Sequence, residues 1–371
     1  MGYVAVQGGI SAIESSEQLS TYIRLKGKSI PLSVKQIMDQ MRLLVDRVMS
    51  EGGMYSPLHA AIAIKQSEGD LLESSFYIRA YRSTLSRITD SLPLNMNDMR
   101  INRRISSAFK DIPGGQILGY TSDYRQRMLD FSLLNENEEA MNKFIEEFEE
   151  KSDDEKDFSC TKFKKVVDIL REQGLVRKSE ESGANLFDIT RDSVSFPAPR
   201  SASLQMMARG ETGGMLSLAY SSMRGYGSIH PTIAELRVGY VPVRISHPYK
   251  KGRALCVGSI KLTETEIVAK FDSGDNEKPY FTLGYGICFG DNEVKSISMA
   301  VLDRSMKETS EEAPANDQEF VLMHIDGIES SGFCAHFKLP HYITFQSDLD
   351  SLRRAQQNSI EEEAKEDGQN A

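Results

Sequence analysis

Two different hydrophobic periodicities divide this sequence, and together they constrain its fold more than any other feature. Between Ser33 and Gly52 the apolar residues recur every three to four positions, behind a capping-box pattern, which predicts an amphipathic helix. Much later, the stretches 236–245, 254–271 and 280–289 alternate between apolar and polar residues, as half-buried strands do. Helices first and strands later indicate an α+β protein, with a helical N-terminal domain followed by a mixed, β-rich domain.

Shifts in composition along the chain predict five segments. A helical N-terminal domain spans 1–95, a basic loop and helix segment 96–135, and an acidic peripheral helix or linker 136–160. A mixed α/β domain follows over 161–357, and the polar, Glu-rich tail over 358–371 is expected to be disordered. Within these segments we expect helices over 124–134 and 292–307 and a loop over 102–119. We expect strands over 3–6, 185–195 and 320–324, and two strands within 254–271.

The net charge of −10 is distributed unevenly. Residues 136–157 hold eleven acids and three lysines, whereas 100–127 hold six bases and two acids. An acidic protein with a local basic stretch suits a small anionic ligand better than a long polyanion such as DNA. We therefore expect no nucleic-acid partner.

Cysteine usage and hydropathy exclude other classes. The four cysteines are scattered without a C-x-x-C pair, so this chain cannot supply an iron–sulfur cluster alone. No apolar run approaches the length of a membrane span, and the first residues lack the features of a secretory signal. We expect a cytoplasmic protein without membrane contact.

The first candidate site is the basic segment that contains Arg103, Arg104 and Lys110. Guanidinium groups bind phosphate oxygens bidentately, and the following Pro113-Gly114-Gly115 would let backbone N–H groups approach an anion. Asp111 beside these bases could hold a magnesium ion that accompanies the phosphates. A solvated basic face followed by a turn is the alternative, and the residues by themselves slightly favour it.

The second candidate site lies in glycine-rich turns between residues 196 and 237. These turns carry Arg200, Arg209, Glu211, Arg224 and His230. Isolated charged residues on such turns are typical of loops that close on a ligand, although no Gly-Lys-Ser/Thr follows the glycines as a Walker A loop requires. Ordinary tight turns in a β-rich domain are the alternative. A similar glycine-rich turn, 284–295, leads into a helix start at Asn292.

The third candidate site is the histidine pair His336 and His341. Their spacing lies within that of zinc-binding histidine pairs, and Pro340 would break the helix and let the two rings converge. His324 and Cys334 lie nearby in the sequence, so a closed four-ligand site is conceivable. Two separate histidines near a surface turn remain the alternative.

Several longer motifs resemble the PhnI family, over residues 3 to about 354. The motifs that carry the resemblance are Tyr3–Gly9, Leu44–Met49, Arg79–Leu85, the basic segment through Gly115, Leu129–Leu134, Phe196–Ala202, Gly284–Lys295 and Lys338–Tyr342. The acidic segment 136–157 and the C-terminal tail are the parts that diverge.

The resemblance implies a function that residue spacing could not reveal. In that family the I subunit of the carbon–phosphorus lyase core complex is linked to displacement of adenine from MgATP by an alkylphosphonate such as methylphosphonate. The product is α-D-ribose 1-methylphosphonate 5-triphosphate, and the subunit alone is associated with ATP nucleosidase activity.

The resemblance also implies partners and a metal. The G, H and L subunits assist, a J subunit of the radical S-adenosylmethionine type cleaves the C–P bond, a K subunit belongs to the system, and two copies of the I subunit are expected per core complex. The family's metal-binding histidine pair, near its contact with the J subunit, maps onto His336 and His341, which implies Zn²⁺ there.

Residue roles follow as a hypothesis. Substitution at the ribose C1′ needs cations for the triphosphate and the phosphonate, and an acid near adenine. The expected anion ligands are Arg103, Arg104, Lys110, Arg200, Arg209 and Arg224, with Asp111 on Mg²⁺ and Glu211 or His230 as the acid. The rival hypothesis is a non-catalytic scaffold that positions the J subunit. A winged-helix-like DNA-binding regulator, suggested by the order of elements over 164–189, is the distant third.

Overall fold

The structure is a computed structural model, and it describes residues 9–152, 162–177, 186–225, 230–272, 278–308 and 313–369. The chain divides into two units: Leu32–Gly327, and a smaller one made of Met1–Pro31 with Ile328–Ala371. These boundaries differ from the predicted domains, since the first residues group with the end of the chain rather than with the helices that follow them. The predicted strand over 3–6 and the end of the acidic segment lie outside the described residues.

Four helices open the larger unit: α2 (Val34–Gln40), α3 (Arg42–Gly52), α4 (Pro57–Gln66) and α5 (Leu71–Ser83). The predicted capping box is present, because Gln36 N–H donates to Ser33 Oγ at 3.1 Å and Ser33 N–H to Gln36 Oε1 at 2.8 Å. The predicted first helix is interrupted at Met41, and Gly53 ends α3 in the left-handed conformation. Their apolar faces form one core cluster: Ile37, Val45, Val48, Met49, Ala60, Ala61, Ala63, Ile64 and Ile78.

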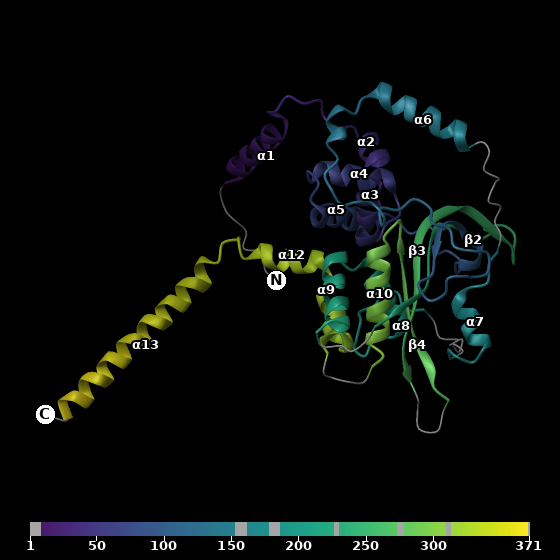
Figure 1. Cartoon of the computed structure of the whole chain (residues 1–371). Helices are drawn as coiled ribbons and strands as arrows, with labels where there is room; N and C mark the ends of the chain where they lie inside the picture. Colours follow the sequence, from purple (N-terminus) through teal and green to yellow (C-terminus); the bar gives the residue numbers. More distant parts are fainter. Residues whose placement is uncertain are drawn as a thin grey trace. The chain divides into compact units, whose positions relative to one another are not determined.

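A four-stranded antiparallel sheet follows, in the order β1-β2-β3-β4. Figure 1 labels β2, β3 and β4. Its strands are β1 (Arg100–Ile105), β2 (Thr232–Ser246), β3 (Ala254–Asp272) and β4 (Tyr280–Phe289). β1 pairs with β2 only as far as Tyr240, so Pro242 lies beyond that pairing.

Helix α10 (Glu293–Ser305) covers one face of the sheet, close against β4 and β3 (Figure 1). Glycines make this contact possible, since a Cβ on Gly284 would lie 2.1 Å from Ala300 O and one on Gly286 would lie 2.0 Å from Ser296 O. Helices α8 (Arg200–Arg209), α9 (Thr212–Met223) and α11 (Gln318–His324), with the 3₁₀ turn η3 (Pro314–Asn316), complete this layer. Met207, Met215, Met299 and Leu322 are among its fully buried core residues.

The other face of the sheet is partly covered by α7 (Val166–Glu172), which Gly174 follows in the left-handed conformation. Val166, Val167 and Leu170 pack with Ala234 and Val268 of the sheet. The remaining elements of this unit are η1 (Met96–Asp98), η2 (Phe131–Asn135) and α6 (Glu138–Ser152).

The smaller unit contains α1 (Ile10–Leu25), most of α12 (Gly327–His336) and α13 (Tyr342–Gln369). None of the described helices combines the length and the apolar run that crossing a bilayer requires.

The predicted α+β class is confirmed, but several local predictions are wrong. Residues 100–105 form β1 rather than a loop, 124–134 contain only the short turn η2, and 186–195 form no strand. Residues 318–324 are helix α11, and 254–272 are one strand, not two. The tail is helical as far as Gln369, because its Glu, Gln, Ala and Lys residues are good helix formers despite lacking an apolar face.

Candidate functional site

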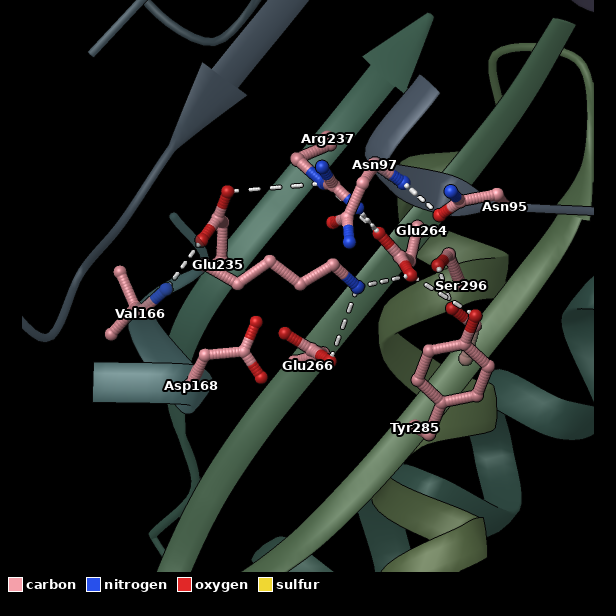
Figure 2. A network of polar contacts seen from close by, with 12 residues as sticks. Asn95, Asn97, Val166, Asp168, Glu235, Arg237, Glu264, Glu266, Tyr285 and Ser296 are labelled. Carbon is pink, nitrogen blue, oxygen red and sulfur yellow. Dashed lines mark hydrogen bonds and ion pairs between the residues drawn. The ribbon is translucent and has the colours of Figure 1, made fainter. Parts of the chain in front are cut away.

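The first polar centre is a buried network on the α7 side of the sheet (Figure 2). Arg237 and Glu264 are directly opposed across β2 and β3, and so are Glu235 and Glu266. Arg237 Nε donates to Glu264 Oε2 at 2.9 Å, and Arg104 Nε donates to Glu235 Oε1 at 2.7 Å. Strand register therefore places Arg237 against Glu264, whereas Glu235 and Glu266 form a like-charged pair that is stabilised by cations from other positions.

Lys165, just before α7, closes this network. Its Nζ lies 2.7 Å from Glu264 Oε1 and 3.4 Å from Glu266 Oε1, and Tyr285 Oη donates to Glu264 Oε1 at 3.1 Å. The other Glu235 oxygen accepts the Val166 N–H at 2.8 Å. Three cations thus face three carboxylates, so the network is balanced within itself.

Among the three carboxylates of this network, Glu266 has the pKa that is shifted closest to neutral pH. Burial raises its pKa to about 7, against the attraction of Lys165, and the charge of Glu264 adds to the rise. Glu264 differs: burial alone would raise its pKa, but Arg237 and Lys165 together hold it below its usual value. The network can hold one proton near neutral pH, and each of its three cations is already in contact with a carboxylate of the network.

The basic segment predicted to bind phosphate is part of this interior. Arg104 is fully buried, and it also donates to the carbonyls of Pro113 and Lys164. Arg103 points to the α10 side, where its Nε donates to Glu293 Oε1 at 2.6 Å and its other nitrogens bind Leu118 O and Asp123. Both guanidinium groups are occupied by protein acceptors in this structure. Lys110 and Asp111 are exposed.

The second polar centre forms around the end of α3. Arg47 Nε donates to Glu51 Oε1 at 2.8 Å, and Arg47 Nη2 donates to Glu211 Oε1 at 2.6 Å. The Glu211 carboxylate also caps α9, because its two oxygens accept the N–H groups of Gly213 and Gly214 at 2.8 and 2.6 Å. Glu211 therefore orients Arg47 and begins a helix at the same time.

Three further arginines come together beside this pair. Arg82 Nη1 donates to Gly53 O at 3.1 Å, and a Cβ on Gly53 would lie 3.0 Å from Arg209 Cδ. Arg79 Nη2 reaches Glu51 O at 3.0 Å and Arg209 O at 3.5 Å, while its Nη1 pairs with Asp326 at 2.6 Å. We call Arg47, Arg79, Arg82 and Arg209 the arginine cluster.

The other predicted residues do not join this cluster. Arg200 and Arg209 are the first and last residues of α8, about 13 Å apart along its axis. Arg200 Nη2 lies 3.1 Å from Asp303 Oδ2. Arg224 ends α9 and is exposed, as is His230, while the motif residues 226–229 lie outside the described residues. Of the residues predicted from sequence, the structure brings together Arg209 and Glu211.

His336 and His341 each form a hydrogen bond to a nearby backbone carbonyl. His336 Nδ1 is hydrogen-bonded to Phe333 O, and His341 Nδ1 lies 2.6 Å from Leu339 O. Because carbonyl oxygens only accept, both Nδ1 atoms carry the proton and both Nε2 atoms keep a lone pair. The ring centroids are 5.4 Å apart. Within the described ranges, no group of three His, Cys, Asp or Glu side chains converges on a metal-sized site.

Sequence reasoning missed Arg47, Arg79 and Arg82 as members of a polar centre. A signal was available, because Arg79 and Arg82 are three residues apart on one helix and thus share a face. The sequence also contains a signal for the network on the sheet, since Glu264 and Glu266 alternate with threonines in a long strand and therefore point to the same face.

Comparison with known proteins identifies relatives along nearly the whole chain. The family described as bacterial phosphonate metabolism protein (PhnI) matches residues 2–359. A protein of Stutzerimonas stutzeri, provisionally named C–P lyase subunit protein HtxH, is 50% identical over 99% of both chains. The α-D-ribose 1-methylphosphonate 5-triphosphate synthase subunit PhnI of Escherichia coli is 45% identical over 96% of this chain and 98% of its own. The subunit of the same name in Rhizobium meliloti is 40% identical over 95% and 94%.

Proposed function

The chain belongs to the PhnI family of bacterial phosphonate metabolism proteins, and from that membership we propose that it displaces adenine from MgATP with an alkylphosphonate. The product would be α-D-ribose 1-methylphosphonate 5-triphosphate when the phosphonate is methylphosphonate. The observation that carries this proposal is the 45% identity, over 96% of the chain, to a protein named as a subunit of that synthase.

The reaction sets three tasks for the protein. It must bind a triphosphate, align a phosphonate oxygen with the ribose C1′, and supply a proton or hydrogen bond to the departing adenine. Arginines suit the first two tasks because their planar donors match tetrahedral oxyanions. Lys110, Arg200, Arg209 and Arg224 remain proposed anion ligands. Arg103 and Arg104 could act only if partner binding released them from their present carboxylates.

Asp111 and His230 fit the remaining roles better than Glu211. Asp111 is an exposed carboxylate, and it can hold Mg²⁺ on the phosphates. Both Glu211 oxygens are occupied in capping α9 and binding Arg47. We therefore assign the proposed acid near adenine to His230, because an imidazole can both carry and release a proton under physiological conditions.

Zinc at His336 and His341 is part of the proposal. The donor set fits, because both imidazoles direct hydrogen bonds from Nδ1 to carbonyls and keep Nε2 available. Zinc bound there would be a structural ion or a Lewis acid, depending on its remaining ligands. His341→Ala should lower the zinc content of the purified complex, measured by elemental analysis. Unchanged zinc content would remove the pair as ligands, and His230→Ala serves as the control.

The partners are proposed to be the G, H, J, K and L subunits of the system, in a cytoplasmic complex with two copies of this chain. Large exposed apolar residues support an assembly role. In 131–148 they are Phe131, Leu133, Leu134, Phe144, Ile145 and Phe148, and in the smaller unit they include Phe333, Phe337, Tyr342 and Phe345. The same residues favour the second candidate function, a scaffold that positions the J subunit without performing chemistry.

One experiment separates the two functions. The chain is mixed with MgATP, with and without methylphosphonate and the partner subunits, and the products are resolved by chromatography. We expect adenine release from MgATP by the chain alone, and the ribose 1-methylphosphonate product with partners present. Adenine release that persists without this chain would leave it only the scaffold function.

A further inference from the structure

The arginine cluster concentrates positive charge at one place on the larger unit. The side chains of Arg82 and Arg209 both pass over Gly53, since a Cβ there would lie 3.2 Å from Arg82 Nη1 and 3.0 Å from Arg209 Cδ. Arg79 donates to the backbone carbonyl of Arg209 at 3.5 Å. Arg82 and Arg209 therefore converge on the glycine that ends α3, and Arg79 lies beside Arg209.

Arg82 differs from its neighbours in how its charge is met. Arg47 is paired with Glu51 and Glu211, and Arg79 with Asp326. Within the described ranges the Arg82 side chain forms no ion pair, and it donates to Gly53 O at 3.1 Å. The carboxylate that attracts it, Asp188, is itself paired with Arg87, so the half-buried Arg82 guanidinium has no carboxylate in direct contact.

The surroundings of Arg82 increase this imbalance. Burial, followed by the positive charges of Arg79 and Arg87, lowers the pKa of the Arg82 guanidinium. The Nε–H of Arg79 is also buried without a hydrogen-bond partner among the described residues. Both features are relieved by a compact anion that accepts several hydrogen bonds.

We propose that Arg82, supported by Arg79 and Arg209, binds a tetrahedral phosphorus oxyanion. Planar guanidinium groups match the edges of such a group bidentately, which an ammonium cannot do. Phosphate chains and phosphonates share this chemistry. The ligand's identity rests on the proposed function, in which both reactants carry such a group, whereas the site itself rests on the contacts and charges above.

A purely structural role for Arg82 is the competing explanation, because cations near the last carbonyls of a helix stabilise its C-terminus. The two roles differ in what a neutral substitution changes. An anion site loses affinity for phosphorus oxyanions, whereas a helix cap loses only stability.

The test uses calorimetric titration of the full chain with tripolyphosphate and, separately, with methylphosphonate. We expect Arg82→Gln to weaken binding at least about tenfold, because one charge-assisted, bidentate contact contributes roughly 1.5–3 kcal/mol. The matched control is Arg244→Gln, which removes a charge on β2 that is already paired with Asp98, and it should change affinity less than about threefold. Arg82→Lys keeps the positive charge but lacks the planar pair of N–H donors, and it should bind with intermediate affinity.

Each outcome decides the proposal. Binding of tripolyphosphate alone, lost in Arg82→Gln, supports a phosphate-chain site, and the same result with methylphosphonate alone supports a phosphonate site. Wild-type affinity in Arg82→Gln for both probes, or no binding of either probe by the wild type, overturns it. If Arg82→Gln does not fold, as judged by thermal melting, Arg82→Lys carries the same test.

Failure here is distinguishable from failure of the proposed function. Wild-type affinity of Arg82→Gln for both probes, together with normal adenine release, would reject this site and leave the activity intact. Arg82-dependent tripolyphosphate binding without adenine release under any condition would keep the anion site and reject the activity.

Discussion

The buried network on the sheet and the arginine cluster use the same side chains in opposite ways. In the network, Arg104, Arg237 and Lys165 each contact a glutamate from a neighbouring element. In the cluster, Arg82 donates to a carbonyl and forms no ion pair with the described residues. The cations of the network are thus neutralised by carboxylates of the same chain, whereas Arg82 remains able to bind an anionic ligand. Charge density along the sequence does not separate the two, because pairing is decided in three dimensions.

The largest expected effect comes from breaking the sheet network. Arg104→Ala would leave the buried Glu235 with its other cation, Arg237, at 3.8 Å, and it should lower the free energy of unfolding by about 3–5 kcal/mol. Urea denaturation would measure this loss. Lys35→Ala, which removes an exposed pair with Asp39, should change stability by less than about 1 kcal/mol. A similarly small loss for Arg104→Ala would contradict the structural role assigned to the network.

A smaller, pH-dependent effect is expected at Glu266. Its pKa in the folded protein, about 7, lies above the usual 4.5, so folding favours the protonated form. The stability that this proton contributes is complete below pH 4.5 and is lost as pH rises toward 7. Glu266→Gln remains neutral and should therefore gain up to about 3 kcal/mol relative to the wild type between pH 5 and pH 8.

Urea denaturation at both pH values would measure that gain, with Glu264→Gln as the control of opposite sign. Arg237 and Lys165 hold the pKa of Glu264 down, so its charged form stabilises the fold, and that stability is lost as pH falls. Equal pH dependence in Glu266→Gln and the wild type would show that Glu266 holds no proton near neutrality.

The smallest effect on stability is expected at Arg82, which sharpens the contrast with Arg104. Arg82→Gln removes one hydrogen bond to a carbonyl and should cost about 1 kcal/mol or less, as measured by thermal melting. A loss as large as that of Arg104→Ala would mean that Arg82 is as structural as the sheet arginines, and the two regions would no longer differ.

Features that depend on neighbouring residues were predictable from the sequence. The capping box at Ser33, the helix over 293–305 and the strand over 280–289 all follow from contacts within about one turn or from side-chain alternation. The order of helices and strands likewise predicted the α+β class.

Features that depend on distant partners were not predictable. Arg103 and Arg104 were interpreted as ligands in a loop because their acceptors lie far away: Glu293 is 190 residues from Arg103, and Glu235 is 131 residues from Arg104. Residues 318–324 resemble a strand because seven residues are too few to distinguish a buried helix from a strand by periodicity. Arg209 and Glu211 are two residues apart in the sequence, but the contact of Glu211 with α3 and that of Arg209 with α5 could be known only from the fold.

The close contacts of Gly284 and Gly286 with α10 fix the distance between this helix and the sheet. At Gly284 and Gly286 backbone lies directly on backbone, with no flexible side chain to absorb a displacement. The same helix carries Lys295, which donates to Ala208 O near the arginine cluster, and Asp303, which holds Arg200. A methyl group added at either glycine would push α10 away from the sheet. Because Lys295 and Asp303 contact opposite ends of α8, the displacement would alter both of these contacts.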